Sequence, residues 1–491
     1  MFFQKTKNQQ GSMMIYLIIT IFIFSIVMVP ILDIITRQIQ ALRLVINKEQ
    51  SLQIAEAGIN YYQWHLAHFP TDYQDGTGQP GPYVHDYKDY DTQEVIGTFS
   101  LEITPPPAGS TIATVKSTGQ TAENPGAART ITVKYGIPSL AKYAFLSSWH
   151  IWIYPSDLIT GQFMSNNGIR FEGIGNAPIQ SAKETYICTW PDGCSPNQTK
   201  PGIWGNPMPP QSTQNFWQFP VPAVDFSALT STLSDMKTLA SQDGGAFYLP
   251  PSNKQGYSLV FNSNGTVSVY KVKKRRSNPT SYGYVYDVWT TRSESSDYGT
   301  GGSDRELLFT NSLPSNGIIF AEDNVWVEGT VRGRVTVAAA KLGETNLLNM
   351  PIIYVPNNIV YSAKDGSDIL GLIAQRDIVY SFYSPTDLEV DAAQIAQNGA
   401  TQVLYYGSGH SCPINQSCPS QYPYIKNSIT TYGSIMSYDG WVWTWSNFAG
   451  TIFYGGYMHT YNNYDGNLLY APPPSFPFST AGYQQLNWIS N

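Results

Sequence analysis

The sequence predicts a mainly β protein: a long N-terminal transmembrane α-helix, a small antiparallel sheet, and then a parallel β-helix (solenoid) head with an α+β insertion. Three observations predict this class. Residues 13–32 carry no charge, and residues 33–66 continue as an amphipathic helical pattern. From about residue 143, short apolar runs alternate with Asn and Gly, as in stacked short strands.

The N-terminal helix is long enough to cross a bilayer and continue beyond it. About 20 apolar residues, at about 1.5 Å each, match the roughly 30 Å hydrocarbon layer. Some 50 Å of the helix would lie outside the lipid. An apolar stripe on this outer part predicts a face that packs on a sheet, with a coiled-coil seam as the alternative. The stripe consists of Ile35, Ile39, Leu42, Ile46, Leu52, Ile59, Tyr62 and Leu66.

Two plainer interpretations of this helix compete. A cleaved secretory signal has a shorter apolar core and a small-residue cleavage site, whereas here the helical pattern continues through Arg37, Arg43 and Glu49. An ordinary single-pass anchor fits better, and Lys5 and Lys7 would keep its N-terminus cytoplasmic. A single-pass anchor in this orientation places the bulk of the chain outside the cell.

Alternating apolar and polar residues predict three strands after the helix, at 95–104, 110–117 and 128–135. Further on, runs of about four residues, a bend at Asn or Asp and another run recur at roughly 20-residue intervals. This pattern favours a parallel β-helix over a β-sandwich, because a sandwich would place hairpin dipeptides between its strands. Residues 201–316 interrupt the pattern with a predicted helix at 226–241 and a hairpin about Asn264-Gly265.

Composition and cysteine placement indicate a chain that lies outside the cell and does not bind nucleic acid. The net charge of −7, with only 13% charged residues, argues against a nucleic-acid-binding surface. Two local pairs, Cys188/Cys194 and Cys412/Cys418, predict two disulfides in an extracellular chain. The alternative is one zinc site of all four cysteines, but the spacing within each pair exceeds the usual two to four residues.

No catalytic motif is present, so we expect a protein that is not an enzyme and has no catalytic, cofactor-binding or metal-binding residues. The enzymatic alternative is sugar cleavage by paired carboxylates, for which Asp387, Glu389 and Asp391 share one side of a strand. A solvated outer face explains these three residues more simply, because Leu388, Val390 and Ala392 would then point inward.

A second candidate site is aromatic. Three alternating tryptophans would lie on one face of a strand, where they would either cap the solenoid end or, with nearby tyrosines, form a surface for a sugar or a partner protein. We favour the cap, because an open solenoid end must be covered. The residues of this possible ligand surface are Trp441, Trp443, Trp445, Tyr454 and Tyr457.

The N-terminus resembles that of type IV pilins, in which a basic leader and a glycine directly precede the apolar helix. Pro30, inside the apolar half, adds to this resemblance. Shaft pilins usually carry Glu at the fifth residue after the cut, and here that residue is Tyr16. The resemblance is therefore to minor subunits of the PilX and GspK types, and it extends along the chain. The stretches similar to PilX-type β-helix-bearing proteins are Ala55-Glu56-Ala57-Gly58-Ile59, Ser117-Thr118-Gly119, Asn167-Gly168-Ile169-Arg170-Phe171, Leu370-Gly371-Leu372-Ile373-Ala374, Tyr464-Asp465, Pro473-Pro474 and Trp488.

This resemblance implies processing between Gly11 and Ser12 by a prepilin peptidase, and a non-enzymatic role as a minor pilin or pseudopilin-like subunit. The implied partners are the membrane, other pilin-like subunits and the pilus assembly machinery, with the head at the tip or base of a surface pilus. The alternative function is a membrane-tethered adhesin that binds a surface glycan or protein through its aromatic C-terminal face.

We therefore divide the chain into seven segments, the last of which is the aromatic cap. They are a leader peptide (1–11), the transmembrane helix and stalk (12–70), a small antiparallel β domain (71–138), the first β-helix rungs (139–200), the α+β insertion (201–316), further rungs (317–440) and the C-terminal cap (441–491).

Overall fold

The computed structural model describes residues 10–107, 110–155, 157–226, 229–242, 247–285, 288–292, 295–406, 412–413, 424–447, 451–479 and 482–490. These residues form two compact units. The first contains the described residues of 1–106, 112–136 and 483–491, and the second contains those of 107–111 and 137–482.

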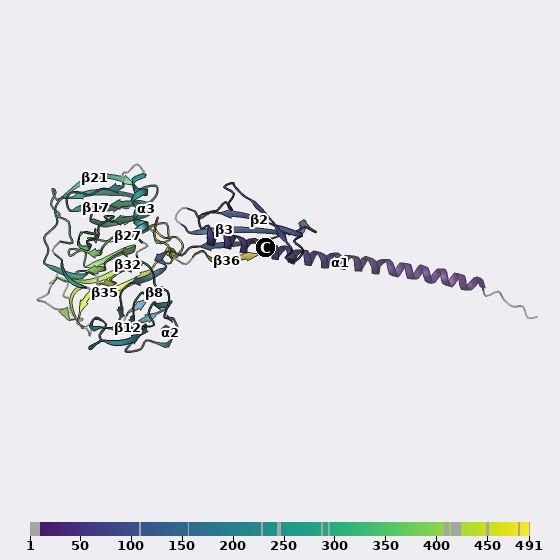
Figure 1. Cartoon of the computed structure of the whole chain (residues 1–491), viewed down its shortest axis with the longest axis horizontal. Helices are drawn as coiled ribbons and strands as arrows, with labels where there is room; N and C mark the ends of the chain where they lie inside the picture. The colour runs from purple at the N-terminus through teal and green to yellow at the C-terminus, as the bar shows by residue number, and fades with distance from the viewer. Residues whose placement is uncertain are drawn as a thin grey trace, which may run out of the picture. The chain divides into compact units, whose positions relative to one another are not determined.

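The first unit is one long helix packed on one antiparallel sheet. Helix α1 (Gln10–His68) contacts β2, β3 and β4, and Figure 1 shows it passing along the sheet and extending beyond it. The three predicted strands are present, and the structure adds one at each edge, including a C-terminal strand that pairs with β4. In sheet order the strands are β1 (Tyr83–Lys88), β2 (Val95–Thr104), β3 (Ile112–Thr121), β4 (Arg129–Gly136) and β36 (Gln484–Ser490).

The second unit is a parallel β-helix, so the predicted fold class is confirmed. Its first sheet runs the length of the solenoid, and every neighbouring pair in it is parallel. In stacking order this sheet contains β16 (Tyr248–Leu249), β22 (Ile318–Ala321), β24 (Arg334–Ala339), β27 (Ile369–Ala374), β29 (Asp387–Ala396), β32 (Ile425–Ser437), β5 (Tyr143–Ser147), β8 (Gln162–Ser165), β11 (Ile179–Ser181) and β15 (Trp217–Gln218).

Two further sides complete the rungs. The second side contains β17 (Gly256–Asn262), β23 (Val325–Val331), β25 (Ile353–Val355), β28 (Ile378–Tyr380), β30 (Thr401–Val403) and β33 (Trp441–Val442), and a separate sheet of β6 (Ile151–Ile153), β9 (Ile169–Phe171) and β14 (Ile203–Trp204). The third contains the end of β23, β26 (Ile359–Tyr361), the first halves of β29 and β32, and β35 (Ile452–Tyr464).

The remaining elements lie outside these three sides of the rungs. The predicted hairpin about Asn264-Gly265 is present as β17 and β18. The remaining strands are β7 (Leu158–Ile159), β10 (Ile174–Gly175), β12 (Thr185–Cys188), β13 (Gln198–Pro201), β18 (Thr266–Val272), β19 (Ser281–Val285), β20 (Val288–Arg292), β21 (Arg305–Ser312), β31 (Cys412–Pro413) and β34 (Thr444–Ser446). The helices are α2 (Gln211–Gln214) and α3 (Leu229–Gln242), with 3-10 turns at Pro125–Ala127, Leu140–Lys142, Trp190–Asp192, Leu347–Asn349 and Gly466–Leu469.

Both faces of the first sheet are buried in strands such as β22 and β27. In β22, Ile319 and Ala321 point into the interior, while Ile318 and Phe320 join an outer apolar layer. Helix α3 covers part of this layer with Leu233, Met236 and Ala240. The helix therefore lies on the flank of the solenoid, and its apolar spacing follows from that packing.

The stacking order of the rungs differs from their order along the chain. Strand β5 pairs with β32, so the rungs from residues 143–204 stack beyond the rung of residues 425–446. Residues assigned to the insertion also extend the solenoid, since β15 stacks on β11 and β16 stacks on β22 at the other end. Parallel strands pair through backbone groups that are alike in every residue, so short strand patterns do not specify their neighbours.

Candidate functional site

Two features are candidates for function. The first is helix α1, whose N-terminal half is exposed and whose C-terminal part packs on the sheet. The second is the set of solenoid corners, the turns that join the strands of the first and second sheets. The N-terminal half of α1 is apolar and exposed from Met13 to Leu32. Within the described residues, one helix is long and apolar enough to cross a membrane by length and composition. Its hydroxyl groups donate to the carbonyls four residues earlier, as at Thr20 and Ser25, which satisfies them without water.

The C-terminal part of α1 is the packing surface for the sheet. Ile54, Ala55, Ile59, Tyr62 and Leu66 are at most 1% exposed. They pack on sheet residues that alternate along the strands, namely Phe99, Leu101, Val115, Ile131, Val133 and Tyr135. Only the later part of the predicted stripe is therefore covered.

The earlier part of that stripe remains exposed in the chain. Ile35, Ile39, Leu42 and Ile46 are 45 to 62% exposed, although they lie beyond the apolar stretch that matches a bilayer. Such a row of apolar residues on a helix is typical of a surface that packs against other helices.

The predicted processing residues, Gly11 and Ser12, lie in the first turns of α1, and their side chains are outside the described residues. Tyr16, where shaft pilins carry Glu, is 69% exposed.

The predicted Cys188–Cys194 disulfide is present and closes a loop on the solenoid wall. Arg170 fixes this loop: its Nη1 donates to the carbonyl of Asp192 at 2.7 Å, and its guanidinium lies 3.8 Å from the centre of the Trp152 ring. Glu172 pairs with Arg170 and accepts from the Trp152 indole. Cys412 and Cys418 have side chains outside the described residues, so their predicted bond is not described.

The C-terminal aromatic residues do not cover an end of the solenoid, and each of the five is buried or half-buried among the rungs. Trp443 is 5% exposed and packs edge-on against Tyr380, and Tyr457 is fully buried. Trp441 stacks on Phe145, with 4.4 Å between ring centres. The half-buried Trp445 donates its indole N–H to the carbonyl of Val403, and Tyr454 is also half-buried. The reason is the stacking order, because a further set of rungs stacks beyond this rung and encloses it.

The three carboxylates of β29 lie in different environments. Leu388, Val390 and Ala392 point into the interior as expected for a solvated outer face. Asp387 is exposed, whereas Asp391 is buried and binds Lys364 Nζ at 2.9 Å and the backbone N–H of Tyr361. Burial raises the pKa of Asp391, and its hydrogen bonds and Lys364 oppose this effect.

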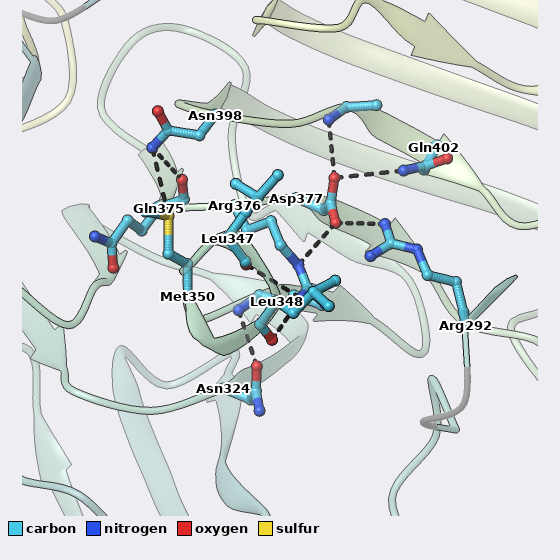
Figure 2. A network of polar contacts seen from close by, with 12 residues as sticks. Arg292, Asn324, Leu347, Leu348, Met350, Gln375, Arg376, Asp377, Asn398 and Gln402 are labelled. Atoms are coloured by element: carbon cyan, nitrogen blue, oxygen red, sulfur yellow. Dashed lines mark hydrogen bonds and ion pairs between the residues drawn. The ribbon is translucent and has the colours of Figure 1, made fainter. Parts of the chain in front are cut away.

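The corners between the first and second sheets carry a ladder of polar side chains. Figure 2 shows Arg292 and Arg376 converging on the carboxylate of Asp377, at 2.6 and 3.1 Å. The other oxygen of this carboxylate accepts from Ala400 N in the next corner. On the preceding rung, Asn324 accepts in the same way from Ile352 N. These bonds tie consecutive rungs together.

The same corner on a neighbouring pair of rungs forms a cleft of about 170 Å³. The two corners beside this cleft are Ser148-Trp149-His150 and Tyr438-Asp439-Gly440. Trp149, His150, Trp152, Asp192, Asp439 and Trp441 line it. Of the residues that line this cleft, Trp441 was predicted to be part of a ligand surface. Trp149 and His150 could not be placed beside it from the sequence, because the two halves of the cleft are almost 300 residues apart and meet through the β5–β32 pairing.

Comparisons with known proteins add only weak similarity to solved structures. No protein-family model and no curated protein matches this sequence. Among solved structures, the chain is similar to the competence-associated pilin ComZ from Thermus thermophilus, with 11% sequence identity and a TM-score of 0.28. That match covers 91% of this chain and 98% of the other. A TM-score this low supports no conclusion about function.

Proposed function

We propose that the protein is a minor pilin-like subunit of a type IV pilus or related filament, anchored by α1 in the cell membrane with its head outside. The observation that carries this proposal is the division of α1. One half is apolar and exposed over the length of a bilayer, and the same helix continues into the core of an antiparallel sheet. A simple tether has no need for the second half.

The exposed residues between the two halves support assembly with other subunits. Ile35, Ile39, Leu42 and Ile46 offer an apolar strip to the helices of neighbouring subunits. Tyr16 in place of Glu favours a subunit present in few copies at the tip or base, and the role is structural, with no catalytic step.

The experiment is intact-mass analysis of the N-terminus of the native protein. We expect the wild-type chain to begin at Ser12 and a Gly11→Val variant to retain residues 1–11 in the membrane fraction. Gln10→Ala is the matched control and should be processed normally. A wild-type chain that begins at Met1 would remove the processing claim.

The second candidate is a membrane-tethered adhesin that never polymerises. The cleft lined by Trp149 and Trp441 supports this candidate, because an adhesin needs a binding site on its head. Shearing of surface filaments separates the two. A minor subunit co-purifies with sheared filaments, whereas a tethered adhesin stays with the membrane.

A further inference from the structure

The cleft arises where one side of the solenoid is interrupted. The first sheet continues across these rungs, since Met436 pairs with Leu146 and Ser437 with Ser147. On the second side, within the described residues, β33 pairs with β30 and β6 pairs with β9, but β33 and β6 do not pair with each other. The strands separate at the corner that carries Trp149 and His150, and the cleft lies between them.

The lining combines flat aromatic rings with hydrogen-bonding groups. Trp441 is half-buried with one face on Phe145. The indole N–H of Trp149 is buried and has no hydrogen-bond partner among the described residues. His150 Nδ1 lies at ion-pair distance, 2.6 Å, from Asp192 Oδ2. Asp439 adds a second carboxylate.

From this lining we infer that the cleft binds one neutral pyranose ring of a surface glycan. The apolar face of a sugar ring suits an indole, and its hydroxyls suit carboxylates, which only accept, together with an N–H donor. Asp192 and Asp439 disfavour phosphorylated or anionic ligands.

A quaternary ammonium group is the main competitor, because aromatic cages bind such cations. The geometry disfavours it. Arg170 and Tyr154 both lie against the Trp152 ring, at 3.8 and 4.5 Å between centres. The inference stands apart from the proposed function, since a filament subunit or a tethered adhesin could carry the site.

The test uses the full chain in a detergent without a sugar headgroup. Methyl glycosides of glucose, galactose, mannose and N-acetylglucosamine, and choline as the competitor, are titrated at millimolar concentration by saturation-transfer NMR and tryptophan fluorescence. We expect at least one glycoside to bind and choline not to bind. Binding of choline alone, or of no glycoside, would overturn the inference.

Variants then locate the site. Trp149→Phe keeps an aromatic ring, although a smaller one than indole, and removes the N–H. Asp439→Asn removes a charge from the lining. Each should weaken glycoside binding by roughly fivefold to tenfold, the effect of one hydrogen bond. Trp190→Phe is the matched control. Trp190 lies on the Cys188–Cys194 disulfide loop, which also carries Asp192, but it is 60% exposed and does not line the cleft.

Each result decides the question. Unchanged affinity in both cleft variants, or an equal loss in Trp190→Phe, would place the binding elsewhere and overturn the inference. Near-UV circular dichroism verifies folding, and if Trp149→Phe fails to fold, Asp439→Asn alone decides.

Discussion

At the scale of single residues, Asp377 shows how the solenoid tolerates buried charge. It is fully buried together with Arg292 and Arg376, which are 4 and 2% exposed. Burial by itself raises the pKa of Asp377, but the two guanidiniums outweigh it and hold the pKa below its ordinary value. The carboxylate is thus the counter-ion of the two guanidiniums and also accepts a hydrogen bond from Ala400 N in the next corner.

Asp377→Asn should destabilise the solenoid by about 3–5 kcal/mol, because it removes the negative charge that two buried guanidiniums share. Denaturant unfolding followed by tryptophan fluorescence measures the change. Asp365→Asn is the control, since Asp365 is an exposed carboxylate that accepts two hydrogen bonds from Ser367 in its own turn. Similar midpoints for both variants would contradict this account.

Lys426 makes stability depend on pH. Burial lowers its pKa to about 8, although Asp297 opposes this shift, and its Nζ donates to the carbonyl of Ser384. Between about pH 8 and pH 10 the folded state has lost this proton while the unfolded state keeps it, so stability should rise with pH in this window.

Unfolding midpoints over this pH range test the assignment. The rise should vanish in Lys426→Met and persist in Lys254→Met, in which an exposed lysine is replaced. Parallel pH profiles for wild type and Lys426→Met would show that another group is responsible.

At the scale of elements, α1 and β3 approach so closely that glycine is required between them. A Cβ atom on Gly119 would overlap the carbonyl oxygen of Ser51 and the amide nitrogen of Ala55. A Cβ on Gly58 would likewise overlap Ser117 and Phe99. These contacts give a physical reason for the Ala-Glu-Ala-Gly and Ser-Thr-Gly stretches.

Gly119→Val should therefore destabilise the first unit by roughly 1–3 kcal/mol, since helix backbone cannot move aside as a flexible side chain can. Amide hydrogen exchange of residues 112–136 reports the loosening. Gly126→Ala is the matched control, because its Cβ would meet only the Asn124 side chain at 3.4 Å. Equal exchange in the two variants would refute the close-packing argument.

At the scale of the whole molecule, the solenoid is stacked out of chain order. The rung of residues 425–446 lies inside the stack, between β29 and β5, rather than at its end. Segments from both ends of the head therefore depend on one another, and the corner cleft is one result.

Hydrogen exchange can test this order. The amides of β5 should exchange as slowly as those of β29 and β32, because all three lie inside one continuous sheet. The short strands β15 and β16, at the ends of that sheet, should exchange faster. Fast exchange of β5 would contradict the stacking order.

Much of the local structure could be predicted from the sequence. The apolar run predicted α1, alternation predicted β2, β3 and β4, and Asn264-Gly265 predicted the β17–β18 hairpin. The close pair Cys188 and Cys194 predicted its disulfide. Each of these depends on side chains near one another in the sequence, whose periodicity states which face is buried.

By itself the sequence determined the class of fold, the helix that can span a membrane and the inward faces of individual strands. Only the tertiary structure decided the order of the rungs, the fifth strand β36, the burial of Trp443 and the meeting of Trp149 with Trp441. The reason is physical: a strand's own pattern records which face it buries, whereas its neighbours are chosen by backbone hydrogen bonds common to all residues.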